Sequence, residues 1–183
     1  MFGLFRNRAQ DALTARLFAG LSAAARHPAL FLDHAVPDTV EGRYDMMVLH
    51  LFLLVQRLQG GSPKARQVGQ AVCDRFFTEM DRAMREMGVG DLTVPKKMTK
   101  IAELYAGCAK VYAEALAAGD RAALAAALQR NVYEGNTAMA AQADALAGYA
   151  QAAAAALAAA PEAALIEGRL PYPEPAGFTG RAA

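Results

Sequence analysis

Helix-breaking residues divide this chain into segments whose apolar residues recur every three to four positions. These breaks fall at His27-Pro28, Pro37, Gly60-Gly61, the segment from Gly88 to Pro95, Gly119 and Pro161. Spacings of three and four place side chains on one face of an α-helix, whereas a strand needs alternation by two, which no long segment shows. The pattern predicts an all-α fold, a compact single-domain bundle of about six to seven helices.

Start and stop signals set the expected helix bounds. His27 precedes a proline and so leaves the α region, whereas Asp38 or Thr39, and then Ser62, supply side-chain caps at helix starts. The expected helices span about 7–26, 38–59, 63–87, 95–118, 120–132 and 136–160. We expect residues 1–160 to form one helical domain that ends in an alanine-rich helix (136–160). The Pro- and Gly-rich tail (161–183) is either disordered or strapped over the core by Tyr172 and Phe178.

Composition excludes several classes of protein. The chain has 19 basic and 18 acidic residues, so no global field favours DNA as a partner. Its longest apolar run, Met46 to Val55, is about half of the ~20 residues that span a bilayer. We interpret the N-terminal segment as an ordinary first helix, with a transit or membrane-surface segment as the alternative. Cys73 and Cys108 lie in helical patterns and are expected to be reduced core residues.

The segment from Met46 to Leu58 is apolar on nearly all sides of the expected helix. Such a helix must be covered all round, either by the rest of the domain or by a partner. His50 lies within it, and a buried histidine bonded to a carbonyl or carboxylate is the expected state.

No set of residues has a spacing typical of catalysis or metal binding. His27, His34 and His50 lack the partners that di-iron or zinc motifs place on one helix face. Glu41 and Asp45 share a face, but no second acidic cluster accompanies them. We therefore predict no catalytic residue, no metal site and no cofactor.

Charged residues gather on both sides of the segment from Gly88 to Pro95. Before it, three pairs stand at i, i+4: Arg75 with Glu79, Asp81 with Arg85, and Arg82 with Glu86. After it, one helix carries four of the five lysines: Lys96, Lys97, Lys100 and Lys110. Either this is a solvated helix face, or it is a basic contact for an acidic protein surface or for RNA phosphates. We expect this segment to bind another protein.

Two stretches resemble the ubiquinol-cytochrome c chaperone family. They are PDTVEGRYD followed closely by LH, within residues 26–58, and MDRAMREMGVGDLTVPKKM, within residues 69–105. Their occurrence in this order is specific, and the resemblance covers about residues 15–133. The alanine-rich helix and the tail lie outside it.

The resemblance implies an all-α chaperone, without known catalytic residues, that assembles the cytochrome bc1 complex. Its implied client is newly made cytochrome b or another bc1 subunit, with a small partner protein and the ribosome as further partners. A bacterial member would act in the cytoplasm, at the inner face of the inner membrane, with peripheral membrane contact; a eukaryotic one would act in the mitochondrial matrix. The hypothesis assigns partner binding to Asp38, Glu41, Arg43, Asp45, Asp81, Arg85, Glu86, Asp91, Lys96, Lys97 and Lys100.

Two other functions remain open from the sequence. One is a helical protein that binds a small molecule or lipid in an apolar pocket. The other is an enzyme on a helical scaffold, which would require Glu41, Asp45, His50 and Asp81 to converge in a cavity.

Overall fold

The computed structural model describes residues 2–178, and their side chains from residue 10 onward. Over this range the chain is all-α, as the apolar periodicity predicts, and contains no strand. The α-helices are α1 (Phe2–Ala25), α2 (Pro28–Leu32), α3 (Val40–Gln59), α4 (Pro63–Glu86), α5 (Val94–Ala118), α6 (Arg121–Val132), α7 (Ala140–Ala159) and α8 (Glu162–Ile166). Short 3-10 helices lie at Thr137–Met139 and Pro175–Phe178. α1 begins at Phe2 rather than near Asn7, since no proline interrupts its first turns.

Helix α3 is the centre of the core. Every residue from Met46 to Leu54 is buried, and α1, α4, α5, α6 and α7 all pack against the helix. The sequence left open whether the domain or a partner covers this apolar helix. The structure shows that the domain itself covers it. Thr39 caps α3 by accepting a hydrogen bond from the Gly42 amide at 3.1 Å. Gly42 allows a close approach, because a Cβ there would overlap the carbonyl oxygen of Pro37.

The alanine-rich helix α7 is a core element. It packs against α3 and α6, and most of its residues from Ala143 to Ala153 are buried. Small side chains permit close helix approach, and here the Arg121 guanidinium of α6 lies over Gly148. Arg121 also forms a bidentate pair with Asp144, at 2.8 and 2.7 Å. This helix is therefore packed on the core rather than frayed at the surface.

The tail, as far as residue 178, is strapped over the core. The Tyr172 hydroxyl donates to the His50 carbonyl at 2.9 Å, and His34 Nε2 donates to the Pro175 carbonyl at 2.9 Å. Phe178 packs edge-on against Tyr149, with ring centroids 5.9 Å apart. Residues 179–183 lie outside the described residues. Of the two states expected for the tail, residues 172–178 adopt the strapped one.

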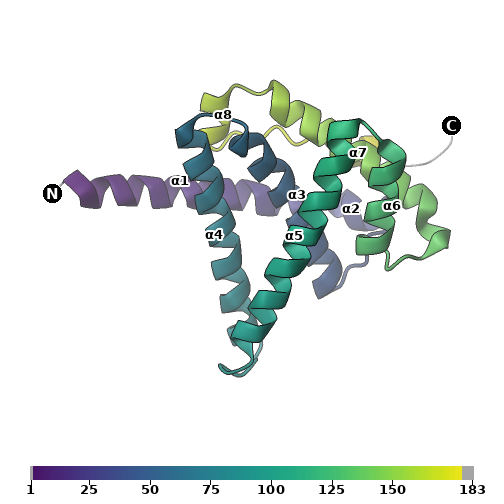
Figure 1. The fold of residues 1–183 in the computed structure, drawn as a ribbon, viewed down its shortest axis with the longest axis horizontal. Helices are drawn as coiled ribbons and strands as arrows, with labels where there is room; N and C mark the ends of the chain where they lie inside the picture. Colours follow the sequence, from purple (N-terminus) through teal and green to yellow (C-terminus); the bar gives the residue numbers. More distant parts are fainter. Residues whose placement is uncertain (1, 179–183) are drawn as a thin grey trace.

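Two features extend from the body of the molecule (Figure 1). The N-terminal end of α1 reaches out on one side, and α4 with α5 forms a long hairpin whose loop is its most distant point. The two hairpin helices separate toward the body, where α3 packs against both. This arrangement places residues 88–93 at the tip, away from every other helix.

Candidate functional site: the α4–α5 hairpin

Backbone hydrogen bonds fix the shape of the hairpin tip. The Val89 amide donates to the Met84 carbonyl and the Gly88 amide donates to the Arg85 carbonyl, both at 3.0 Å. This pair of bonds is a Schellman motif, which requires a left-handed residue, and Gly88 has φ of +81°. The Thr93 and Val94 amides then donate to the Gly90 carbonyl, at 2.8 and 3.2 Å. The loop is a defined structure because most of its turns are closed by hydrogen bonds.

Apolar side chains hold α4 and α5 together. Near the tip, Met84 and Val94 are buried. Farther along, Phe77 packs edge-on against Tyr105, with ring centroids 5.9 Å apart. The Tyr44 hydroxyl of α3 donates to the Ile101 carbonyl at 3.2 Å. The hairpin is thereby joined to the core at its middle, and its tip is left free.

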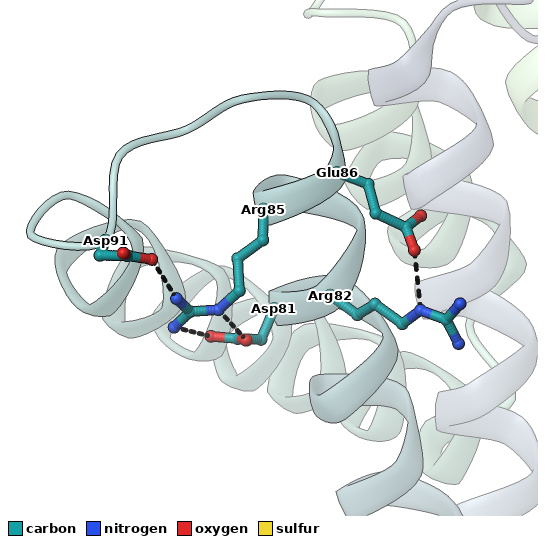
Figure 2. Close-up of polar contacts among 5 residues, drawn as sticks. All are labelled: Asp81, Arg82, Arg85, Glu86 and Asp91. Carbon is teal, nitrogen blue, oxygen red and sulfur yellow. Dashed lines mark hydrogen bonds and ion pairs between the residues drawn. The ribbon is translucent and has the colours of Figure 1, made fainter.

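Arg85 joins the end of α4 to the loop (Figure 2). Its guanidinium donates to both carboxylate oxygens of Asp81, at 2.6 and 3.2 Å, and to Asp91 at 2.5 Å. The bond from Arg85 holds the pKa of the Asp81 carboxyl below its usual range. Arg82 and Glu86 form a separate pair at 2.8 Å on the neighbouring face. The predicted i, i+4 pairs Asp81–Arg85, Arg82–Glu86 and Arg75–Glu79 are all present.

The three lysines at the start of α5 are in a different situation. Lys96, Lys97 and Lys100 are exposed, and none of the ion pairs among the described residues includes them. The three tip acids are each bound to an arginine. Two arginines offset two of the three negative charges, so with the three lysines the tip has a net charge of +2.

Exposed apolar side chains are also present at the tip, and one of them, Leu92, was missing from the sequence-based hypothesis. Leu92 is 98% exposed and Met87 is 61% exposed. The only signal in the sequence is a leucine in a segment bounded by glycine and proline. Of the three methionines at the end of α4, Met84 is buried and Met80 packs against the core. Only Met87 offers exposed surface.

The other predicted partner-binding residues lie at the start of α3. Arg43 donates to Asp38 at 2.7 Å, and Glu41 is exposed in the first turn. Asp45 is half-buried, and burial together with the negative charges of Glu41 and Glu134 raises the pKa of its carboxyl to about 7. These four residues form a second group, apart from the network of Asp81, Arg85 and Asp91.

The residues that an enzyme would have needed to bring together do not converge. His50 is fully buried, with Nδ1 donating to the Met46 carbonyl and Nε2 accepting from the Tyr149 hydroxyl, each at 2.7 Å. This confirms the expected core histidine, and burial lowers its pKa to about 4. Asp81 lies far along the hairpin in its pair with Arg85. Burial also raises the thiol pKa of both Cys73 and Cys108, the opposite of what a nucleophile needs.

The described residues also show what is absent. Between residues 2 and 178, no helix is long and apolar enough to cross a membrane. No three His, Cys, Asp or Glu side chains in the described part of the chain are placed to hold a metal ion together.

Fold and site together define an all-helical protein with a charged, projecting hairpin. Comparison with known proteins identifies its family. The family model described as "Ubiquinol-cytochrome C chaperone" matches residues 32–172, so the chain belongs to the ubiquinol-cytochrome c chaperone family. The matched range begins at residue 32 and ends at residue 172, so it extends beyond the indicated region of about 15–133 only on the C-terminal side. It includes α7, which corrects the expectation that the alanine-rich helix lies outside the resemblance.

A solved structure supports the same assignment. The chain is similar to the crystal structure of the Cbp3 homolog from Brucella abortus, with a TM-score of 0.86 and 35% sequence identity. The alignment covers 95% of this chain and 97% of that one. No curated protein sequence matches the chain.

Proposed function

We propose that this protein is an assembly factor for the cytochrome bc1 complex that binds newly made cytochrome b. The observation that carries the proposal is the match to the ubiquinol-cytochrome c chaperone family over residues 32–172. The similarity to the Cbp3 homolog over nearly the whole of both chains supports it. The role is one of binding without catalysis, and we place it at the inner face of the inner membrane.

The hairpin and the start of α3 are the proposed contact surfaces. Because the domain encloses α3 from Met46 to Leu54, the apolar side chains of that stretch pack in the core and are not available to a client. The free lysines at the start of α5 and the exposed Glu41 and Asp38 lie on the outer surface. Interfaces use such a charged rim to orient a partner. We propose that a small partner protein or the ribosome also docks on this surface.

A gene deletion tests the function. We expect the deletion strain to lose assembled bc1 complex while transcripts of the bc1 subunits stay at wild-type levels. The tagged protein, purified from solubilised membranes after crosslinking, should carry cytochrome b with it. Normal amounts of bc1 complex in the deletion strain would contradict the proposal.

The lysines test the contact surface. We expect K96E/K97E to weaken crosslinking to its client or to the ribosome, because reversing two free charges at a polar rim opposes docking. The free energy of unfolding should stay within about 1 kcal/mol of wild type, since both side chains are exposed. The matched control is K64E/K110E, which changes the net charge equally with the other two lysines of the chain. Equal crosslinking in the two variants would argue against the hairpin.

A further inference from the structure

The tip of the α4–α5 hairpin combines an exposed apolar apex with free positive charge. Leu92, at the apex, is 98% exposed, and Met87 beside the Schellman turn is 61% exposed. An isolated exposed leucine is ordinary on a protein surface. This one belongs to the hydrogen-bonded loop between α4 and α5, which forms the end of the projecting hairpin (Figure 1). Ordered presentation of an apolar side chain away from the body calls for an explanation.

The net charge around the apex is positive. Residues 81–100 contain five basic and three acidic residues, a net charge of +2, against +1 for the whole chain. Arg85 binds Asp81 and Asp91, and Arg82 binds Glu86, so the two arginines offset two of the three carboxylate charges and one negative charge remains (Figure 2). Lys96, Lys97 and Lys100 are left to face an external anion.

The lysines lie close enough to the apex to reach the headgroup layer of a bilayer that the apex contacts. Lys100 is six residues from the start of α5, which is about 9 Å along a helix. The polar layer on each side of a bilayer is about 5–7 Å thick, and lysine side chains extend toward such a layer while the stem stays among apolar groups. With Leu92 at the headgroup level, the three lysines lie within about 9 Å along the helix from the start of α5, a distance over which lysine side chains can extend to lipid phosphates.

From these observations we propose that the α4–α5 tip docks on an anionic phospholipid surface, with Leu92 inserted at the headgroup level and Lys96, Lys97 and Lys100 bound to lipid phosphates. The tip projects from the body of the molecule (Figure 1), so a flat surface can reach it. A bilayer needs no matching shape. RNA is less suited, because it favours aromatic and arginine contacts, and both tip arginines are held by carboxylates.

This inference does not depend on the proposed client. It concerns the chain and lipid alone and is tested with protein-free vesicles, so its failure would leave the assembly function standing. It also differs from a membrane-spanning anchor, since no helix within residues 2–178 could form one.

The first measurement uses tryptophan fluorescence. The chain has no tryptophan, so L92W gives a single reporter at the apex and keeps it apolar. We expect a blue shift when full-length L92W meets vesicles of phosphatidylglycerol and phosphatidylcholine, and no shift with phosphatidylcholine alone. The control is L32W, because Leu32 is 79% exposed but lies in α2, off the hairpin. An unshifted L92W spectrum, or an equal shift in L32W, overturns the proposal.

The second measurement is vesicle flotation of full-length variants. A lysine near an anionic surface is worth about fivefold in partitioning, so K96E/K97E should lower the partition coefficient more than tenfold. L92D should lower it about tenfold, whereas K64E/K110E and L32D should bind as wild type does. Binding of the wild type should weaken as salt is raised. Equal losses in tip and control variants would overturn the proposal.

RNA provides the competing outcome. If K96E/K97E abolishes binding to an RNA oligonucleotide while vesicle flotation is unchanged, the lysines belong to a nucleic-acid contact and the membrane proposal is wrong. Circular dichroism melting of each variant shows that a loss of binding is not a loss of folding.

Discussion

Asp45 lies half-buried on α3 without an ion-pair partner among the described residues, and this position makes it a source of pH dependence. Burial and the charges of Glu41 and Glu134 raise the pKa of its carboxyl from the ordinary value of 3.8 to about 7 in the folded protein. The folded state therefore holds a proton that the unfolded state releases between about pH 4 and pH 7. Stability falls as pH rises through this window.

Asp45→Asn tests this sign. Asparagine resembles the protonated carboxyl, so we expect the two proteins to unfold with equal free energy below pH 4. At pH 8 the variant should be more stable by about 2 kcal/mol, a value reduced for the part of the side chain that solvent still reaches. Denaturant titrations across the range measure the difference. A constant difference at all pH values would contradict the raised pKa.

His50 acts in the opposite direction. Burial lowers its pKa to about 4. Between about pH 6.5 and pH 4 the unfolded chain therefore binds a proton at this ring and the folded protein does not. Stability from this residue is lost as pH falls. The Asp45→Asn comparison removes this contribution, because His50 is unchanged in both proteins.

At the scale of elements, the end of α4 depends on one backbone conformation. Gly88 has φ of +81°, a region that costs other residues roughly 1 kcal/mol, and a Cβ there would meet nothing within 4 Å. Gly90 in the same loop is equally open but lacks the positive φ. The sequence predicted that α4 ends here, because glycine and proline both disfavour the helix within a few residues of their position.

Gly88→Ala and Gly90→Ala distinguish the effect of backbone strain from the effect of adding a methyl group. We expect Gly88→Ala to lower the free energy of unfolding by about 1 kcal/mol through backbone strain. Gly90→Ala should leave it unchanged or slightly raised, since alanine restricts the unfolded chain. Urea unfolding of both variants provides the measurement. Equal effects would mean that the Schellman turn is not formed in solution.

At the scale of the whole molecule, the C-terminal strap keeps water from the centre of the domain. The Tyr172 ring lies edge-on to His50 with centroids 5.0 Å apart, and its hydroxyl donates to the His50 carbonyl. His34 and Phe178 hold the strap at two further points. Residues more than 120 positions apart thus share one buried cluster.

Tyr172 variants test whether the strap shields His50. Tyr172→Phe removes one hydrogen bond and should cost about 1 kcal/mol while leaving the His50 pKa low. Tyr172→Ala opens the site, so we expect the His50 pKa to rise from about 4 toward 6.5. NMR titration of the His50 ring reads this directly. An unmoved pKa in Tyr172→Ala would show that other groups provide the burial.

Much of the fold and part of the site could be predicted from neighbouring residues. Thr39, Ser62 and Asp120 cap helices as their residue types indicate, and the i, i+4 ion pairs form because helix geometry brings them together. Asp91 was named as part of the contact surface, but its bond to Arg85 needs the loop to fold back on α4. No pattern in the sequence indicated that Leu92 is exposed.

By itself the sequence determined the helices, their ends and the family motifs, because caps, prolines and helical periodicity act over about four residues. Only the tertiary structure decided that α3 is enclosed by the domain and that residues 172–178 cover His50. It alone left three lysines free beside an exposed Leu92. Those outcomes depend on contacts across the chain, such as Tyr44 with Ile101 and His34 with Pro175, which no local pattern specifies.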